Sequence, residues 1–220
     1  MRVALSWSTG KDSALTLHEL ISQHHEVVSL FTTLTEGYHR VTMHGVRREL
    51  LQAQARSLGL DLLEVWIPPN APNEVYEERM SQAVSRLVTE YGVEAIAFGD
   101  IWLEDVRRYR EQKMSGTGVE LLFPIWGRDP LDLVRRFLEL GYRAVICVVD
   151  GSQTDPSKIL GSDLSLELVS SHAIDAAGER GEYHTFVYDG PLFKFPVRFS
   201  LGHRVVRDDR FHYVDLVPAI

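Results

Sequence analysis

Cysteine is nearly absent from this sequence of 220 residues, since Cys147 is the only one. A single cysteine cannot form an internal disulfide, so nothing here indicates the disulfide framework of an extracellular protein. Cys147 lies in an apolar run at residues 144–149, which favours a buried residue on a strand over a reactive thiol.

Long apolar runs are also missing. No stretch approaches the roughly 20 apolar residues that a membrane helix needs. The apolar stretch after Met1 is too short for the core of a signal peptide. We therefore expect a cytoplasmic protein with no membrane partner.

The chain has no excess of basic residues. It contains 23 Lys and Arg against 31 Asp and Glu, a net charge of −8, whereas a broad nucleic-acid surface needs excess positive charge. A nucleic-acid partner is therefore not expected, although the net charge does not exclude a local basic groove. The nine histidines show no HxxxH or HxH spacing and no cysteine pair accompanies them, so we predict no zinc site.

The first half of the sequence alternates strand and helix. Hydrophobic residues make up 45% and charged residues 25%, as in an ordinary globular protein. Apolar runs predict strands at residues 3–6, 26–33, 62–67 and 94–98, and three- and four-residue spacing predicts helices at 12–23, at 45–59 and from Asn73 onward. This βαβαβαβ order predicts an α/β fold with a parallel sheet and right-handed crossovers.

The pattern changes after about residue 100. We predict a charged helix at 102–112, a flexible break at 115–118, and a helix capped by Asp129 with Pro130 first and Gly141 just past its end. A strand at 142–149 and a turn-rich stretch at 150–161 follow. Further strands are predicted at 185–188, 197–206 and 211–217, the last two joined by a turn at 207–210. We place a domain boundary at the break, giving a nucleotide-binding domain at 1–118 and a smaller α+β domain at 119–220.

The strongest chemical signal is the phosphate loop, residues 6–13, which lies between the first strand and the first helix. Unpaired amides at a helix N-terminus attract anions, and ligands of open α/β sheets bind beyond the carboxyl ends of the strands. Gly10 allows close backbone approach, and Lys11 adds a positive charge. A turn whose polar residues only cap the helix is the alternative. The predicted nucleotide-binding residues are Ser6, Ser8, Thr9, Gly10, Lys11, Asp12 and Ser13.

Asp12 is the unexpected residue in this loop. Its carboxylate would repel phosphates unless a divalent cation neutralised the site, so we predict Asp12 as a ligand of Mg²⁺. The loop is not a Walker A motif, because the glycine spacing is absent and Lys11 precedes Asp rather than Ser or Thr.

A second group of polar residues lies at 178–185, with the sequence Gly-Glu-Arg-Gly-Glu-Tyr-His-Thr. Two carboxylates beside an aromatic ring and an imidazole could hold a cation, orient an amine or share a metal ion. A solvated turn is the alternative. The candidate substrate-binding residues in this 178–185 segment are Glu179, Glu182, Tyr183, His184 and Thr185.

Four other polar residues are candidates by position. His44 and Arg47 lie at the same end of the predicted sheet as the phosphate loop, or else they begin an amphipathic helix. Asp100 follows the carboxyl end of a strand, where ligand contacts gather, or else it is a turn residue. Glu104 comes next, with a solvated helix face as its alternative. We assign His44 and Asp100 to the nucleotide and Glu104 to the substrate.

The two segments together resemble a known family. Residues 8–13 are similar to the signature loop of the PP-loop ATP pyrophosphatases, Ser-Gly-Gly-x-Asp-Ser, with Thr9 in place of the first glycine. The 178–185 segment is similar to the Gly-Glu-Gly-Gly-Glu-Tyr-x-Thr motif of the diphthine–ammonia ligase family, with Arg180 in place of a glycine. Residues 43–48, 98–107 and 123–126 resemble compact members of that family, called adenine nucleotide α-hydrolase-like, so the resemblance covers nearly the whole chain.

The resemblance implies a Rossmann-like PP-loop domain followed by a substrate domain, with ATP and Mg²⁺ as cofactors. Such an enzyme releases pyrophosphate from ATP, leaves AMP on a carboxylate and replaces it with ammonia to form an amide. The best-known acceptor is diphthine, a modified histidine on a translation elongation factor. Lys11, Asp12 and Ser13 would form the catalytic group. In this group Lys11 would pair with the β and γ phosphates. Glu179, Glu182 and Tyr183 would hold the quaternary ammonium of diphthine.

Two other functions stay open at this point. A tRNA-modifying PP-loop enzyme, such as a thiolase, commonly needs cysteines and a basic surface, which this chain lacks. A non-catalytic ATP-binding sensor would leave the 178–185 segment without a role. The sequence also leaves open whether the protein forms a homodimer.

Overall fold

A mostly parallel sheet forms the first half of the chain. The computed structural model describes residues 1–171 and 174–219. β1 (Arg2–Ser6) is central, with β2 (Glu26–Thr35) and β4 (Asp61–Ile67) on one side and β5 (Ala95–Ala97) and β6 (Glu120–Leu122) on the other, all parallel. The predicted parallel sheet is confirmed. The short β3 (Arg40–Val41), antiparallel to β2, was not predicted.

The order of the strands reverses at β1. The chain passes outward from β1 to β2 and β4, then returns to the other side of β1 to form β5. In open α/β sheets the loops on either side of such a reversal separate, and ligands bind in the crevice between them. In this sheet the two loops that separate are those after β1 and β5. The phosphate loop follows β1, so it lies at this crevice.

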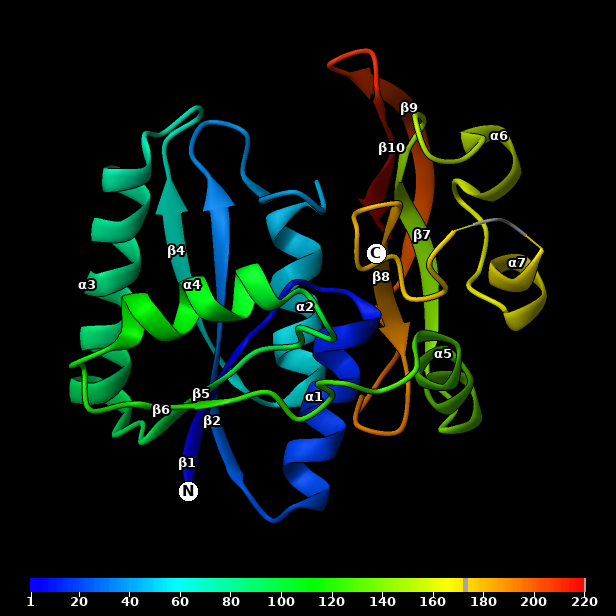
Figure 1. Cartoon of the computed structure of the whole chain (residues 1–220). Coiled ribbons are helices and arrows are strands. Elements are labelled where there is room, and N and C mark those ends of the chain that lie inside the picture. Colours follow the sequence, from blue (N-terminus) through cyan, green and yellow to red (C-terminus); the bar gives the residue numbers. More distant parts are fainter. Residues whose placement is uncertain (172–173, 220) are drawn as a thin grey trace.

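Four helices pack around the first sheet (Figure 1): α1 (Lys11–Ser22), α2 (Arg48–Leu58), α3 (Asn73–Tyr91) and α4 (Glu104–Met114). Leu17 of α1 and Leu51 of α2 are buried in one cluster with Leu5 of β1, and Leu87 of α3 is buried in another with Phe31 of β2. The alternation predicted from the sequence thus covers both faces of the sheet. α4 differs from the others, because it has no buried residue.

α2 begins at Arg48, so the helix start predicted at Gly45 is wrong. Gly45 has a φ of 64° and its N–H donates to the carbonyl of Val41 at 2.9 Å, which closes a turn after β3. A Cβ atom at this position would lie 2.8 Å from the ring of Tyr213, so glycine is required. The predicted end at Gly59 is confirmed, since that residue caps α2 with a φ of 71°.

An antiparallel sheet of four strands forms the second half. Its order is β8 (Tyr183–Asp189), β7 (Arg143–Asp150), β10 (Phe211–Pro218) and β9 (Phe199–Arg207). α5 (Pro130–Glu139) begins as predicted, with the side chain of Asp129 accepting from the amide of Asp132 at 3.0 Å. The short α6 (Pro156–Ile159) and α7 (Leu166–Ser170) were not predicted. The expected α+β second half is confirmed.

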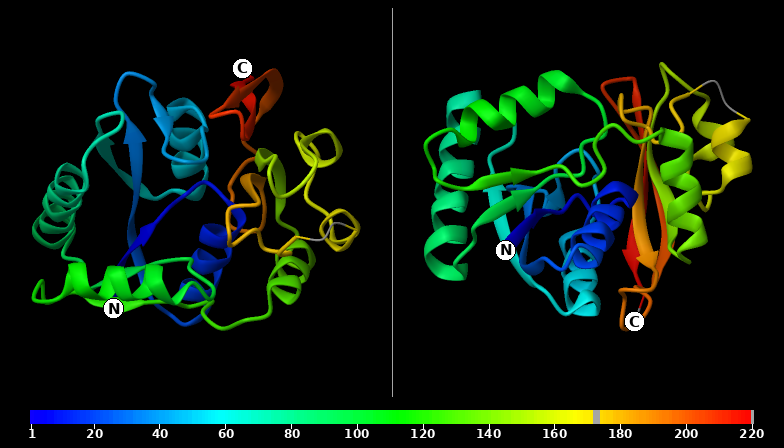
Figure 2. Two further views of the ribbon diagram at one scale, coloured as in Figure 1. Left: turned by 45° about the horizontal axis from the view of Figure 1, so that its top comes forward. Right: turned by 60° about the horizontal axis from the view of Figure 1, so that its bottom comes forward.

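The second sheet packs beside α1 and α2 (Figures 1 and 2). One cluster of buried residues runs from Leu5 of β1 through Leu17 of α1 to Phe186 of β8. β6 pairs with β5, so the first sheet includes residues 120–122. The division into 1–118 and 119–220 stays a prediction. Among the described helices, none has the length and apolar character needed to cross a membrane.

Candidate active site

A cleft of about 340 Å³ opens beyond the ends of β1, β2 and β5. It brings the phosphate loop together with part of the 178–185 segment, which lies directly before and within β8. The predicted site residues that line the cleft are Ser6, Ser8, Asp12, Ser13, His44, Asp100, Glu179 and His184.

The phosphate loop has a strained residue at its centre. Thr9 has a φ of 76°, a left-handed value that threonine rarely adopts. Its carbonyl accepts from the amide of Val187 at 2.9 Å and from Nε2 of Gln54 at 3.1 Å, which fixes this conformation. The Thr9 hydroxyl is buried and has no hydrogen-bond partner in the part of the chain that the structure describes. Thr9 does not line the cleft, so its hydroxyl would meet a phosphate only if the loop moved.

Gly10 allows the loop to approach the second sheet. A Cβ atom at Gly10 would lie 3.0 Å from Cε1 of His44 and 3.1 Å from the carbonyl of Thr185. Gly10 is the N-cap of α1 and has no side chain to cap it. The amide of Lys11 is used, because it donates to Oγ1 of Thr185 at 3.0 Å. The hydroxyl of Ser13, which lines the cleft, lies 3.3 Å from that of Ser8.

Lys11 is buried and does not line the cleft. Its Nζ donates to Oδ2 of Asp12 at 2.9 Å and to the carbonyl of Ala177, and lies 5.1 Å from the ring centre of Tyr183. Burial lowers the pKa of this ammonium, but Asp12 and Tyr183 outweigh burial and raise it above its usual value. The predicted contact of Lys11 with the β and γ phosphates therefore requires the ammonium to leave these partners.

Asp12 has one carboxylate oxygen without a partner. Its Oδ1 is buried and makes no hydrogen bond among the described residues. Burial raises the pKa of Asp12, with Lys11 opposing it, so a bound cation would favour the ionised form. Across residues 1–171 and 174–219, no group of three or more His, Cys, Asp or Glu could hold a metal ion by itself. Mg²⁺ usually takes one or two carboxylates with waters and phosphate oxygens, so Asp12 fits the predicted site as a single protein ligand.

Glu182 does not face the cleft. It is buried, and its two carboxylate oxygens accept from the amides of Asp175 at 3.3 Å and Arg180 at 3.0 Å, within the same loop. The side chain of Arg180 is exposed and lies 4.9 Å from the ring centre of Trp102. Glu182 therefore braces the turn before β8.

Tyr183 and Thr185 are buried as well. The Tyr183 hydroxyl donates to the carbonyl of Ala176 at 2.5 Å, and Lys11 covers its ring. The structure thus separates the three residues predicted to hold a quaternary ammonium, because Glu179 reaches the cleft while Glu182 and Tyr183 do not.

Glu179 is fixed at the cleft wall. Gly178 before it has a φ of 68°, and a Cβ atom there would lie 2.8 Å from the carbonyl of Tyr183. Oε1 of Glu179 accepts from the amides of Ile101 at 2.9 Å and Trp102 at 3.4 Å. Burial raises the pKa of Glu179 to about 7, so this carboxyl exchanges its proton near neutral pH.

His44 and His184 form a second part of the wall. Their ring centres lie 4.5 Å apart, and Nδ1 of His44 lies 3.3 Å from the carbonyl of Thr185. Burial lowers the pKa of His184 to about 4, and burial together with His184 lowers that of His44 well below its usual value. Both rings are therefore neutral at pH 7. The Nδ1–H of His44 donates to the Thr185 carbonyl, so its Nε2 is an acceptor, whereas the one N–H of neutral His184 is an uncharged donor.

The remaining candidates lie apart from one another. Asp100 lines the cleft but is bound by Arg110 of α4 through two contacts at 2.6 and 3.0 Å. Glu104 is exposed and lines a separate concavity with Trp126, so the structure does not bring it to the other predicted substrate-binding residues. Arg47 lies away from the cleft and pairs with Asp215 of β10 at 2.6 Å.

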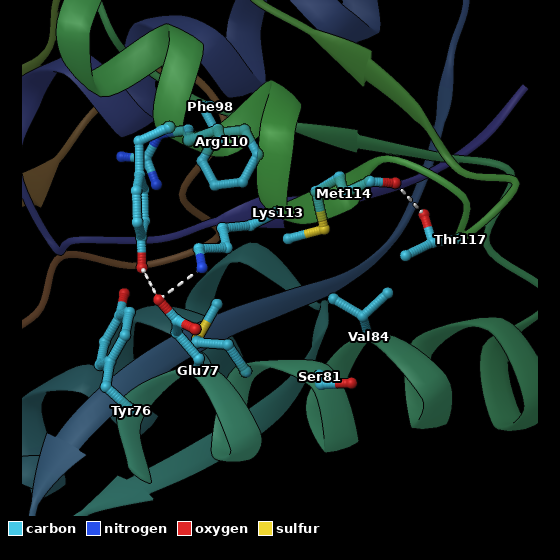
Figure 3. Close-up of a pocket in the computed structure, with 11 residues that line it drawn as sticks. Tyr76, Glu77, Ser81, Val84, Phe98, Arg110, Lys113, Met114 and Thr117 are labelled. Atoms are coloured by element: carbon cyan, nitrogen blue, oxygen red, sulfur yellow. Dashed lines mark hydrogen bonds and ion pairs between the residues drawn. The ribbon is translucent and has the colours of Figure 1, made fainter. Parts of the chain in front are cut away.

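An apolar pocket of about 230 Å³ adjoins the cleft between α3 and α4 (Figure 3). Four residues line both spaces: Tyr76, Met80, Phe98 and Arg110. Glu77 joins the two helices, accepting from Lys113 at 2.7 Å and from the Tyr109 hydroxyl at 3.4 Å. The pocket suits a flat ring or an alkyl group better than a phosphate. The charged sequence of α4 does not predict this pocket.

Gln54 is a site residue that the sequence analysis missed. It is buried on α2, where Oε1 accepts from Nε1 of Trp7 at 2.8 Å. Its Nε2 donates to the carbonyls of Thr9 at 3.1 Å and Val187 at 2.6 Å, which joins the phosphate loop to β8. A glutamine within the apolar stripe of α2 was the signal available in the sequence.

Cys147 is buried as predicted. Burial raises the pKa of its thiol to about 12, so a thiolate is disfavoured. The thiol lies 3.5 Å from the carbonyl of His184 and 3.7 Å from that of His44, behind the histidine pair.

Comparison with known proteins gives a consistent result over both halves. The diphthamide synthase N-terminal domain matches residues 1–121, and the diphthamide synthase C-terminal domain matches residues 129–213. A human diphthine–ammonia ligase is 29% identical, covering 88% of this chain and 81% of its own, and the rat protein is 28% identical over 94% and 85%. The relative from Schizosaccharomyces pombe is 27% identical, with only 35% of its length covered.

A solved structure, described as a predicted subunit of tRNA methyltransferase from Methanocaldococcus jannaschii, aligns with 67% of this chain and 80% of its own. The identity is 16% and the TM-score is 0.43, too low to support an inference about fold or function.

Proposed function

The chain belongs to the diphthamide synthase family, and on this premise we propose that it is an ATP-dependent ligase that adenylates a carboxylate and amidates it with ammonia. One observation supports this most directly. The phosphate loop lines a single cleft with Glu179 and a neutral histidine pair, and Oδ1 of Asp12 in this loop is buried without a partner among the described residues.

The reaction requires activation, because a carboxylate does not react with ammonia while hydroxide is the leaving group. Transfer of AMP to the carboxylate supplies a better leaving group and releases pyrophosphate. The start of α1 and the hydroxyls of Ser8 and Ser13 would bind the phosphates, with His184 as an uncharged donor beside them. Mg²⁺, held by Asp12, would neutralise phosphate charge.

Preorganisation is the physical basis of this proposal. The loop is tied to β8 through Gln54 and Thr185, so its donors are oriented before a nucleotide binds. Donors that need no rearrangement stabilise developing charge more effectively than mobile ones.

For the acceptor we propose diphthine on a translation elongation factor, since the human and rat relatives carry the name diphthine–ammonia ligase. Sulfur transfer to tRNA is disfavoured, because Cys147 is buried with a raised pKa and the net charge is −8.

The test is incubation of the chain with ATP, Mg²⁺, ammonium and an elongation factor that carries diphthine. We expect AMP and pyrophosphate in equal amounts and conversion of the acceptor carboxyl to an amide, detected by mass spectrometry. ADP as the product would overturn the proposal, and binding of ATP without turnover would favour a sensor. Asp12→Asn should lose turnover, whereas Asp105→Asn, an exposed change on α4, should keep it.

A further inference from the structure

The two glutamates of the 178–185 segment differ in what their oxygens do. Both oxygens of Glu182 accept backbone hydrogen bonds. In Glu179 only Oε1 does, accepting from Ile101 and Trp102, and Oε2 makes no hydrogen bond among the described residues. Glu179 also lines the cleft. Oε2 is thus the oxygen of this cleft-lining carboxylate that is left to accept from a ligand.

The charges around Glu179 favour a cation at this oxygen. Burial is the largest cause of the raised pKa of Glu179, and the negative charges of Asp12 on α1 and Asp100 after β5 raise it further. The nearby cationic groups already have partners: Lys11 is bound by Asp12 and the carbonyl of Ala177, and Arg110 by Asp100. No protein cation among the described residues therefore forms an ion pair with Oε2.

Two kinds of cation take part in the proposed reaction, and the geometry distinguishes them. A quaternary ammonium has no N–H and is bound best by open aromatic faces. Here Lys11 lies over the ring of Tyr183 and Arg180 lies over that of Trp102. An ammonium ion donates hydrogen bonds, and a single free carboxylate oxygen is a suitable acceptor.

We infer that Oε2 of Glu179 is the docking site and proton acceptor for the ammonium ion that supplies the amide nitrogen. This inference rests on the proposed function for its acyl-adenylate. One N–H bond of ammonium breaks and the proton passes to Glu179. The nitrogen lone pair then forms the C–N bond at the acyl carbon, the bond from that carbon to the AMP oxygen breaks, and AMP leaves with the electron pair. The new amide nitrogen loses its extra proton to AMP or solvent.

Glu179 is suited to this step for a second reason. Its pKa of about 7 lets it be ionised when ammonium arrives and still hold the proton it receives. The charged groups that face it are Asp12 and Lys11 from α1 and Asp100 from the loop after β5.

The kinetic test compares two nucleophiles in Glu179→Gln. Hydroxylamine is largely unprotonated at neutral pH, so it needs no base. We expect Glu179→Gln to lose about 100-fold in rate with ammonium and to keep a rate near wild type with hydroxylamine. Its rate with ammonium should rise with pH as free ammonia increases. Glu182→Gln, the matched change at a glutamate with no free oxygen, should leave the ratio of the two rates unchanged. Equal losses with both nucleophiles, or no loss with ammonium, would overturn the inference.

A binding measurement separates this inference from the proposed function. In wild type, the backbone amide signal of Trp102 should shift in a saturable way with ammonium chloride but not with tetramethylammonium chloride. In Glu179→Gln neither salt should shift it. If the Trp102 signal of the wild type does not shift with ammonium, the docking site is overturned even if the ligase is active. A wild type that forms no pyrophosphate would overturn the proposed function, while the Trp102 signal still decides the docking site.

Discussion

The backbone amide of Lys11 donates a hydrogen bond of 3.0 Å to Oγ1 of Thr185, which joins the first turn of α1 to β8. Both groups are buried, and the residues are 174 positions apart in the chain. The phosphate loop is therefore held in place by the second half of the chain, and its geometry depends on contacts that the loop itself cannot make.

Thr185→Val should weaken both folding and nucleotide binding. The change removes the acceptor and leaves the buried amide of Lys11 unpaired, which costs about 1–3 kcal/mol of unfolding free energy. ATP affinity should fall several-fold, because the start of α1 is no longer fixed. Urea denaturation and titration calorimetry measure the two effects. Thr185→Ser keeps the hydroxyl and should stay near wild type. A valine variant with wild-type stability would contradict the role assigned to this bond.

Gln54→Leu should lower the unfolding free energy strongly, although leucine and glutamine are similar in size. It leaves Nε1 of Trp7 without an acceptor and the carbonyls of Thr9 and Val187 without one of their donors. Each buried group left unpaired costs about 1–3 kcal/mol. Gln52→Leu, on the same helix and half-buried, offers the matched control. Equal unfolding free energies for the two variants would show that Gln54 does not anchor the loop.

Sequence patterns predict this fold well where the signal is local. The β1 strand and the amphipathic α1 predict the phosphate loop between them, and Asp129 with Pro130 predicts the start of α5. β6 was missed because three residues, Glu120–Leu122, are too few to show a period.

The roles of individual site residues were less predictable, because they depend on distant partners. Lys11 and Asp12 are adjacent, yet only Asp12 lines the cleft, since the carbonyl of Ala177 binds the Lys11 ammonium. Glu179 and Glu182 have the same chemistry and lie three residues apart. The backbone turn at Gly178 directs one to the cleft and the other into its own loop, and spacing alone cannot show this.

Lys11→Met tests whether the lysine serves the fold or the phosphates. Because it leaves the Asp12 carboxylate without its buried cation, we expect a loss of about 3 kcal/mol in unfolding free energy. The double change Lys11→Met with Asp12→Asn should recover part of this loss. Lys158→Met, at an exposed lysine, should be nearly neutral. If Lys11→Met keeps its stability and loses only ATP affinity, the ammonium acts on the phosphates.

Asp215→Asn should remove pH-dependent ion pairs between the two halves of the chain. Asp215 of β10 accepts from Arg40 at 2.9 Å and Arg47 at 2.6 Å, and these contacts lower its pKa to about 2. The folded pKa lies below the unfolded value of about 3.9. The stabilisation is therefore present above pH 4 and is lost as the pH falls toward 2. It amounts to about 2.6 kcal/mol at most, and solvent screening of these partly exposed groups reduces it.

Urea unfolding of wild type and Asp215→Asn checks this dependence. The difference in unfolding free energy should be largest at pH 7 and should shrink between pH 4 and 2. A difference that stays constant over that range would exclude the ion pairs as its source.

His184 should make the fold sensitive to mild acid. Burial lowers its pKa to about 4, against an unfolded value of about 6.5, so the unfolded chain takes up the proton first. The contribution of His184 to stability is therefore complete above pH 6.5, is lost as the pH falls from 6.5 to 4, and changes no further below. The shift corresponds to about 3 kcal/mol. In His184→Asn the unfolding free energy should fall less steeply over this range, because the group that titrates is gone. His203→Asn, at an exposed histidine, should keep the wild-type slope. Identical slopes in all three proteins would mean that the fold does not lower the pKa of His184, which would contradict the burial of a neutral ring beside the phosphate loop.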